Sequence, residues 1–63
     1  PLTDDVVEQA ADIYASLHRT GQLIGEVDTL IAATALVHNL VLVTNNERHF
    51  NRVPGLQIEN WLK

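Results

Sequence analysis

The sequence contains no cysteine and no methionine, and its only aromatic residues are one Trp, one Tyr and one Phe among 63 positions. The missing cysteines exclude a disulfide framework and a thiolate zinc site, and they favour the reducing cytoplasm as the protein's location. Basic residues are also scarce, since four Lys and Arg face eight Asp and Glu for a formal net charge of −4. This balance argues against a module that binds nucleic acid by charge alone. It does not exclude a metal-dependent nuclease, because such sites are themselves acidic.

Long hydrophobic runs are absent as well. The longest nearly apolar run, Leu30 to Val37, is far shorter than the ~20 residues that a membrane-spanning helix needs. The N-terminus also lacks the basic, apolar and small-residue pattern of a signal peptide. We therefore expect no membrane partner.

The chain is short, but its composition is that of a folded protein. Hydrophobic residues make up 46% of it, which is too many for a disordered segment. A chain of this size buries only about 60% of its unfolded surface, so such domains usually rely on a disulfide, a metal or a partner. Because the sequence begins at Pro1, either an initiator methionine has been removed or the chain is a fragment.

Two helices are predicted in the first two thirds of the chain. The spacing of apolar residues predicts an amphipathic helix over residues 3–20, with Thr3 or Asp4 as its cap and Gly21 just past its end. A second helix is predicted over residues 27–39. It is apolar on nearly every side, so we expect it to be buried on more than one side, and Asn39 is expected to end it.

The last third predicts β-structure. Residues 40–44 form an unbroken aliphatic run, which is typical of a parallel strand covered on both faces. Residues 56–58 predict a short edge strand, residues 45–52 a polar turn-rich loop, and residues 59–63 a tail docked by Trp61.

This order predicts an α/β fold, namely one part of a parallel sheet flanked by helices. A two-stranded sheet is marginal alone. We therefore expect further strands from a partner chain or from a missing N-terminal half.

Polar residues at two places can carry chemistry. Asp28 stands near the start of the second helix, where it can act as an N-cap, as a metal ligand, or as both. Thr44, Asn46 and Glu47 follow the predicted strand, where open α/β sheets place their ligands. They form either a simple polar turn or a set of oxygen donors for Mg²⁺ or Mn²⁺. The three histidines, His18, His38 and His49, have no metal-ligand spacing among themselves. His18 is expected to interact with a helix C-terminus and His38 to lie on the surface at a helix end, whereas His49 stands near the candidate site but can simply be loop surface.

Two stretches of the sequence resemble known proteins. Residues 24–36, IGEVDTLIAATAL, resemble the third conserved block of the PIN-domain ribonucleases. Residues 42–50, LVTNNERHF, with RVPGL at 52–56 and ENW at 59–61, resemble the ending of the VapC-type toxins of that family. The resemblance covers nearly the whole chain and places residues 1–63 as the C-terminal part of a PIN-like domain.

The resemblance implies a function for the complete domain. PIN-domain ribonucleases hold Mg²⁺ or Mn²⁺ with acidic side chains and use metal-activated water to cleave an RNA phosphodiester. VapC-type toxins are blocked by a cognate antitoxin and often form dimers. On this basis Asp28 is the catalytic, metal-binding acid, and Asn46 stands where many relatives have another acid. Thr44, Glu26 and Glu47 are supporting residues, with Glu26 ranked as a loop or capping residue.

The sequence also departs from the family. The family's first Asp and the Glu of an early helix are absent from this chain. One carboxylate is too few for a catalytic Mg²⁺ site, so we expect the isolated chain to be inactive. The alternative is a small non-catalytic protein derived from such a toxin, which binds an antitoxin or pairs with itself.

Overall fold

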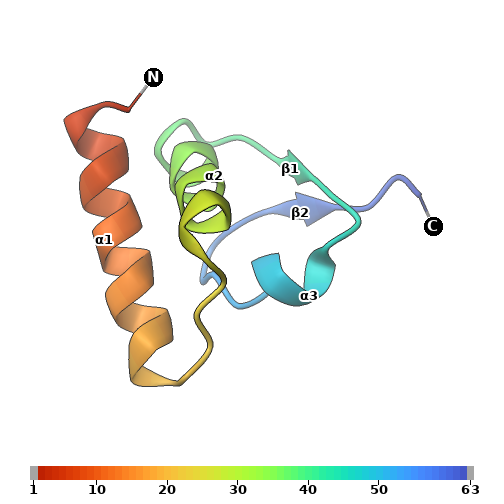
Figure 1. Cartoon of the computed structure of the whole chain (residues 1–63). Helices are drawn as coiled ribbons and strands as arrows, with labels where there is room; N and C mark the ends of the chain where they lie inside the picture. Colours follow the sequence, from red (N-terminus) through yellow and green to blue (C-terminus); the bar gives the residue numbers. More distant parts are fainter. Residues whose placement is uncertain (1, 63) are drawn as a thin grey trace.

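Two helices lie side by side, and a small parallel sheet lies beyond the second helix (Figure 1). The computed structural model describes residues 2–62. Its elements are, in chain order, α1 (Asp4–Arg19), α2 (Glu26–Val37), β1 (Leu42–Val43), α3 (Glu47–Phe50) and β2 (Ile58–Glu59). This order and the parallel pairing of β1 with β2 confirm the predicted α/β fold. Within residues 2–62 no helix is both long and apolar enough to cross a membrane.

The ends of α1 are set by local sequence, as predicted. At the start, Thr3 Oγ1 accepts a hydrogen bond from the Val6 N–H over 3.4 Å. At the end, Gly21 has a φ of 68°, and the Gln22 N–H donates to the Leu17 carbonyl over 2.8 Å. This bond closes the last turn in the Schellman pattern, which needs a left-handed residue directly after the helix.

The second helix ends in the same way, with asparagine in the place of glycine. Asn39 has a φ of 54°, and the Leu40 N–H donates to the Ala35 carbonyl over 2.8 Å. Asn39 therefore ends α2, as the sequence predicts. At the other end Gly25, with a φ of 94°, takes the cap position, so the helix begins one residue earlier than predicted.

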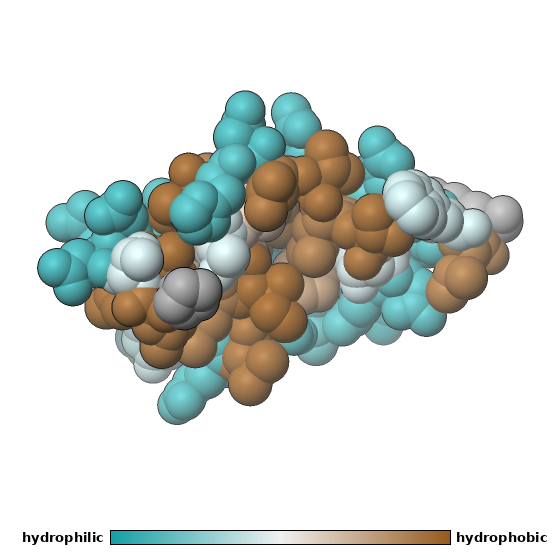
Figure 2. Space-filling view, turned by 90° about the horizontal axis from the view of Figure 1, so that it is seen from above, coloured by the Kyte–Doolittle hydropathy of each residue, from teal (hydrophilic) through white to brown (hydrophobic). Residues whose placement is uncertain are grey.

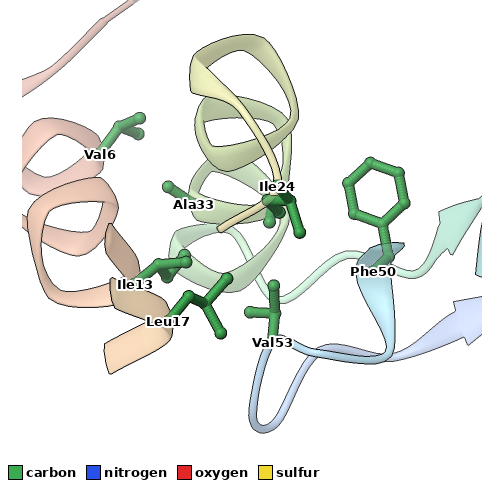
Figure 3. Close-up of a cluster of buried hydrophobic side chains, with 8 residues drawn as sticks. Val6, Ile13, Leu17, Ile24, Ala33, Phe50 and Val53 are labelled. Carbon is green, nitrogen blue, oxygen red and sulfur yellow. The ribbon is translucent and has the colours of Figure 1, made fainter. Parts of the chain in front are cut away.

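The core lies between the two helices and the chain that follows them (Figure 3). Val6, Ile13 and Leu17 point from α1 toward α2, whose Ala32 and Ala33 are fully buried. The small alanine side chains let the two helices approach closely. Ile24, Phe50 and Val53 close the cluster from the connecting segment and from the region of α3; its buried members are Val6, Ile13, Leu17, Ile24, Ala32, Ala33, Phe50 and Val53.

The β-structure is shorter than predicted. Of residues 40–44 only Leu42 and Val43 form β1, and Leu40, Val41 and Val43 are exposed by 55%, 44% and 44%. The expectation of a strand covered on both faces is therefore wrong for residues 2–62. Within this range β1 has a strand on one edge only, and Leu42 pairs there with Ile58.

Three further expectations for the C-terminal third need correction. The second strand is Ile58–Glu59 rather than 56–58, and the loop 45–52 contains the single-turn helix α3. Trp61 does not dock on the core. Trp61 is 74% exposed, because the bond from its Nε1–H to Glu59 Oε1 over 2.9 Å keeps the indole beside the end of β2, where it borders a hollow with Val43 and Leu62 rather than the core. The tail's last residue, Lys63, lies outside the described residues.

An apolar groove runs between α2 and β1. We call it the α2–β1 groove; its main lining residues are Val27, Leu30, Ile31, Leu40, Val41 and Leu42. Viewed from above, hydrophobic surface spreads across the middle of the molecule (Figure 2). The helix that the sequence predicts to be buried on several sides is therefore covered by α1 on one side and open on this one.

Asn39 provides a test of how α2 ends. A valine tolerates a left-handed backbone poorly, so Asn39→Val should lower the free energy of unfolding by about 1–2 kcal/mol. Asn39→Gly should keep or slightly raise it, because glycine adopts this φ without strain. Urea unfolding followed by circular dichroism, at one fixed protein concentration, measures both. Equal stability of the two variants would contradict the assigned role of Asn39.

Candidate metal-binding site

A cluster of polar side chains lies at the C-terminal end of β1. Thr44 follows the strand directly, and its Oγ1 accepts a hydrogen bond from the Asn46 N–H over 3.0 Å. This bond folds the chain back two residues later and places Asn46 at the start of α3. Thr44 thus shapes the turn and positions Asn46, in keeping with the supporting role expected for it.

Asp28 reaches the same cluster from α2. It is the third residue of the helix, and the cap position belongs to Gly25. The expectation that Asp28 acts as the N-cap is therefore wrong: the glycine's left-handed backbone starts the helix before the aspartate is reached. The carboxylate is free to point toward α3, where its Oδ2 lies 3.2 Å from His49 Nδ1.

His49 connects the two parts of the cluster. Its Nδ1 lies 3.2 Å from Asp28 Oδ2 and 3.1 Å from Asn46 Nδ2. The expectation that His49 is merely a surface residue misses this contact. The signal in the sequence is the Asn-x-x-His spacing of residues 46–49, which places both side chains on one face of a helical turn.

The contacts described for the two glutamates are with other parts of the molecule. Glu26 is exposed at the first position of α2, and it borders a hollow against Ala10, Ala11 and Tyr14 of α1. Residues two apart on a helix do not share a face, so Glu26 does not join Asp28. Glu47 Oε2 accepts a hydrogen bond from Asn60 Nδ2 over 3.0 Å and so ties α3 to the segment after β2.

Two side chains of the cluster carry oxygen donors. The Asp28 carboxylate and the Asn46 amide are oxygen ligands of the kind that Mg²⁺ and Mn²⁺ take. Within residues 2–62, however, no three His, Asp or Glu side chains are grouped so that they could hold a metal ion. These donors are of the type that binds a hard divalent cation, but they are too few for a complete site, which needs further ligands.

Comparisons with known proteins all give the same family. The family model described as PIN domain matches residues 1–56. The chain is 51% identical over 51 residues to Ribonuclease VapC2 of Haemophilus influenzae, covering 81% of this chain and 39% of that protein. It is 49% identical over 49 residues to the tRNA(fMet)-specific endonuclease VapC of Salmonella typhimurium, covering 78% of this chain and 37% of that protein.

A solved structure shows the same fold. All of this chain superposes on 47% of a chain in the structure of VapBC-1 from nontypeable Haemophilus influenzae, with a TM-score of 0.93 and 32% identity. The chain thus spans less than half the length of the relatives that it matches, and its architecture is that of a partial PIN domain. By the family match over most of its length and by these likenesses, the chain belongs to the PIN-domain family and is a relative of its VapC ribonucleases.

Proposed function

We propose that this chain is the C-terminal part of a metal-dependent endoribonuclease of the VapC type, acting on RNA in the cytoplasm. The observation that carries the proposal is the meeting of Asp28 and Asn46, through His49, at the C-terminal end of β1. Ligand sites of open parallel sheets lie at this end of the strands. The relatives' printed names, ribonuclease and tRNA(fMet)-specific endonuclease, support RNA as the substrate.

The residues of this chain have distinct parts in the proposed chemistry. Asp28 gives the site its negative charge, and Asn46 adds a neutral amide oxygen. Thr44 holds Asn46 in place through the 3.0 Å bond to its N–H. Bound Mg²⁺ or Mn²⁺ would activate water and stabilise the charge that develops on the phosphate. Glu26 has no part in this mechanism, since it lies toward α1.

The chain alone lacks the charge for catalysis. One carboxylate and one amide leave a dication largely uncompensated, whereas Mg²⁺ sites in phosphoryl-transfer enzymes usually combine carboxylates with phosphate and several waters. The remaining carboxylates are proposed to come from the part of a VapC protein that this chain does not span. That part would also add strands beside β1 and cover the α2–β1 groove.

A cognate antitoxin is the proposed protein partner. The solved structures that resemble this chain are VapBC toxin–antitoxin complexes. The open groove also supports the second candidate function, a non-catalytic protein that binds an antitoxin or another copy of itself. The two candidates differ in whether completing the domain yields RNA cleavage.

A chimera tests the proposed activity. The segment of Haemophilus influenzae VapC2 that precedes the region similar to this chain would be fused before Pro1. We expect RNA cleavage that requires Mg²⁺ or Mn²⁺. Asp28→Asn should lower the rate at least about 100-fold, because a metal ligand supports several kcal/mol of transition-state stabilisation.

Glu26→Gln is the matched control for Asp28→Asn. Both substitutions remove one acid from the first turn of α2, but only Asp28 faces the site, so Glu26→Gln should keep the rate within about twofold. The unfused chain should show no metal-dependent cleavage. Cleavage by the unfused chain that is lost on Asp28→Asn, or equal rates of the two chimeric variants, would contradict the proposal.

The open groove predicts self-association of the unfused chain. Burial of apolar side chains that are exposed to water in the monomer stabilises the associated form by about 25 cal/mol per Å² of buried surface. Sedimentation equilibrium should therefore give a mass above 7.0 kDa. Val27→Lys, in the groove, should shift the chain toward monomer.

Val7→Lys is the control for Val27→Lys. Both valines are exposed on helices, by 51% for Val7 and 71% for Val27, but Val7 lies on α1 outside the groove. Val7→Lys should therefore leave the self-association of the chain unchanged. A monomeric chain that unfolds cooperatively would contradict this prediction, because it would show that the fold is stable with the groove exposed to water.

A further inference from the structure

His49 Nδ1 faces two hydrogen-bond partners whose requirements differ. A single ring nitrogen, Nδ1, lies 3.2 Å from the Asp28 carboxylate and 3.1 Å from the Asn46 amide nitrogen. In a neutral imidazole each nitrogen either donates or accepts. A carboxylate needs a donor there, whereas an amide NH₂ needs an acceptor. Turning the amide over brings its oxygen to the same place, and two acceptors then compete for one N–H. Either way, the single nitrogen cannot give each of the two contacts a full hydrogen bond of its own.

A bound cation would remove this mismatch, because all three side chains could then act as electron-pair donors to it. With the amide oxygen turned inward, Asp28 Oδ2 and the Asn46 oxygen would both lie next to His49 Nδ1, and a cation beside them could take a lone pair from each. Neighbouring ligands of an octahedral ion, with bonds near 2.1 Å, lie about 3 Å from one another. The observed separations of 3.2 Å and 3.1 Å match that spacing. The site is also open to solvent, with the His49 and Asp28 side chains 40% and 28% exposed.

We propose that His49 is a metal ligand through Nδ1, beside Asp28 and Asn46. This inference rests on the proposed metal dependence and adds a nitrogen donor to a site otherwise made of oxygens. Imidazole suits transition metals, whereas Mg²⁺ takes oxygen ligands. The site therefore favours Mn²⁺, which accepts both kinds of ligand, over Mg²⁺.

The chain carries its own controls for this proposal. His18 stacks on Tyr14 at the end of α1, with ring centroids 5.9 Å apart, and His38 caps the C-terminal end of α2. Neither histidine contacts Asp28 or Asn46 in the interactions found over residues 2–62. A nitrogen signal from bound Mn²⁺ that depends on His49 alone is therefore specific to the proposed site.

Pulsed electron paramagnetic resonance of Mn²⁺ bound to the 63-residue chain tests the proposal. We expect a ¹⁴N coupling from an imidazole, which changes to the ¹⁵N pattern when histidine is labelled with ¹⁵N. His49→Gln should abolish the coupling and weaken Mn²⁺ binding at least about 10-fold, the loss typical even of partners behind a metal ligand. His38→Gln should change neither. The ¹⁵N experiment needs no substitution, so it holds even if His49→Gln fails to fold.

The outcomes separate this inference from the proposed function. Mn²⁺ binding that Asp28→Asn abolishes, without any ¹⁴N coupling in the unsubstituted chain, would overturn the role of His49 and leave the metal-dependent nuclease standing. His49 would then only hydrogen-bond Asp28. Mn²⁺ binding that is unchanged in Asp28→Asn would contradict both. No binding of Mn²⁺ at millimolar concentration would overturn the role of His49 and leave the proposed function standing, because that function places further ligands outside this chain. A Mg²⁺ affinity equal to that for Mn²⁺ would overturn the metal preference.

Discussion

The packing of α1 against α2 is the interaction on which the rest of this molecule depends. Val6 of α1 and Ala32 and Ala33 of α2 are fully buried where the helices meet. Because the buried residues of α2 at this contact are small, the helix lies close to α1 and its other side is turned toward β1 (Figure 1). That orientation decides two things together. It leaves Val27 and Ile31 in an open apolar groove, and it turns Asp28 toward the end of the strand, while Glu26 borders α1 instead.

The open side of α2 and the small set of proposed metal ligands would have the same origin. A parallel strand gains stability from neighbours on both edges and from cover on both faces, yet β1 has only β2 beside it within residues 2–62. The missing cover would come from the same part of a VapC protein that is proposed to bring the other carboxylates. One segment would thus supply both the apolar cover of α2 and β1 and the negative charge that the metal needs. Folding of the sheet and assembly of the site would then be coupled.

The site depends on contacts between residues that are close in space but far apart in the sequence. Asp28 and His49 stand 21 residues apart along the chain and 3.2 Å apart in the structure. Thr44 holds the turn that brings α3 under the end of β1, and Glu47 anchors α3 to the segment after β2 through Asn60. The single-turn helix α3 is therefore held from both sides, which keeps Asn46 and His49 on the face that meets Asp28.

The sequence by itself determined the two long helices, three of their four ends and the family. Thr3, Gly21 and Asn39 act through hydrogen bonds to residues within one helical turn, so their effect can be derived from a few neighbouring positions. The motif around Asp28 and the residues after the strand were likewise enough to identify the PIN-domain family, and they predict Asp28 and Asn46 as its site residues in this chain. Only the tertiary structure decided that β1 keeps two residues, that Trp61 stays in solvent and that His49 contacts Asp28. Each of these depends on which surfaces the packed helices leave covered or open, and that is a property of distant residues brought together, which local pattern does not contain.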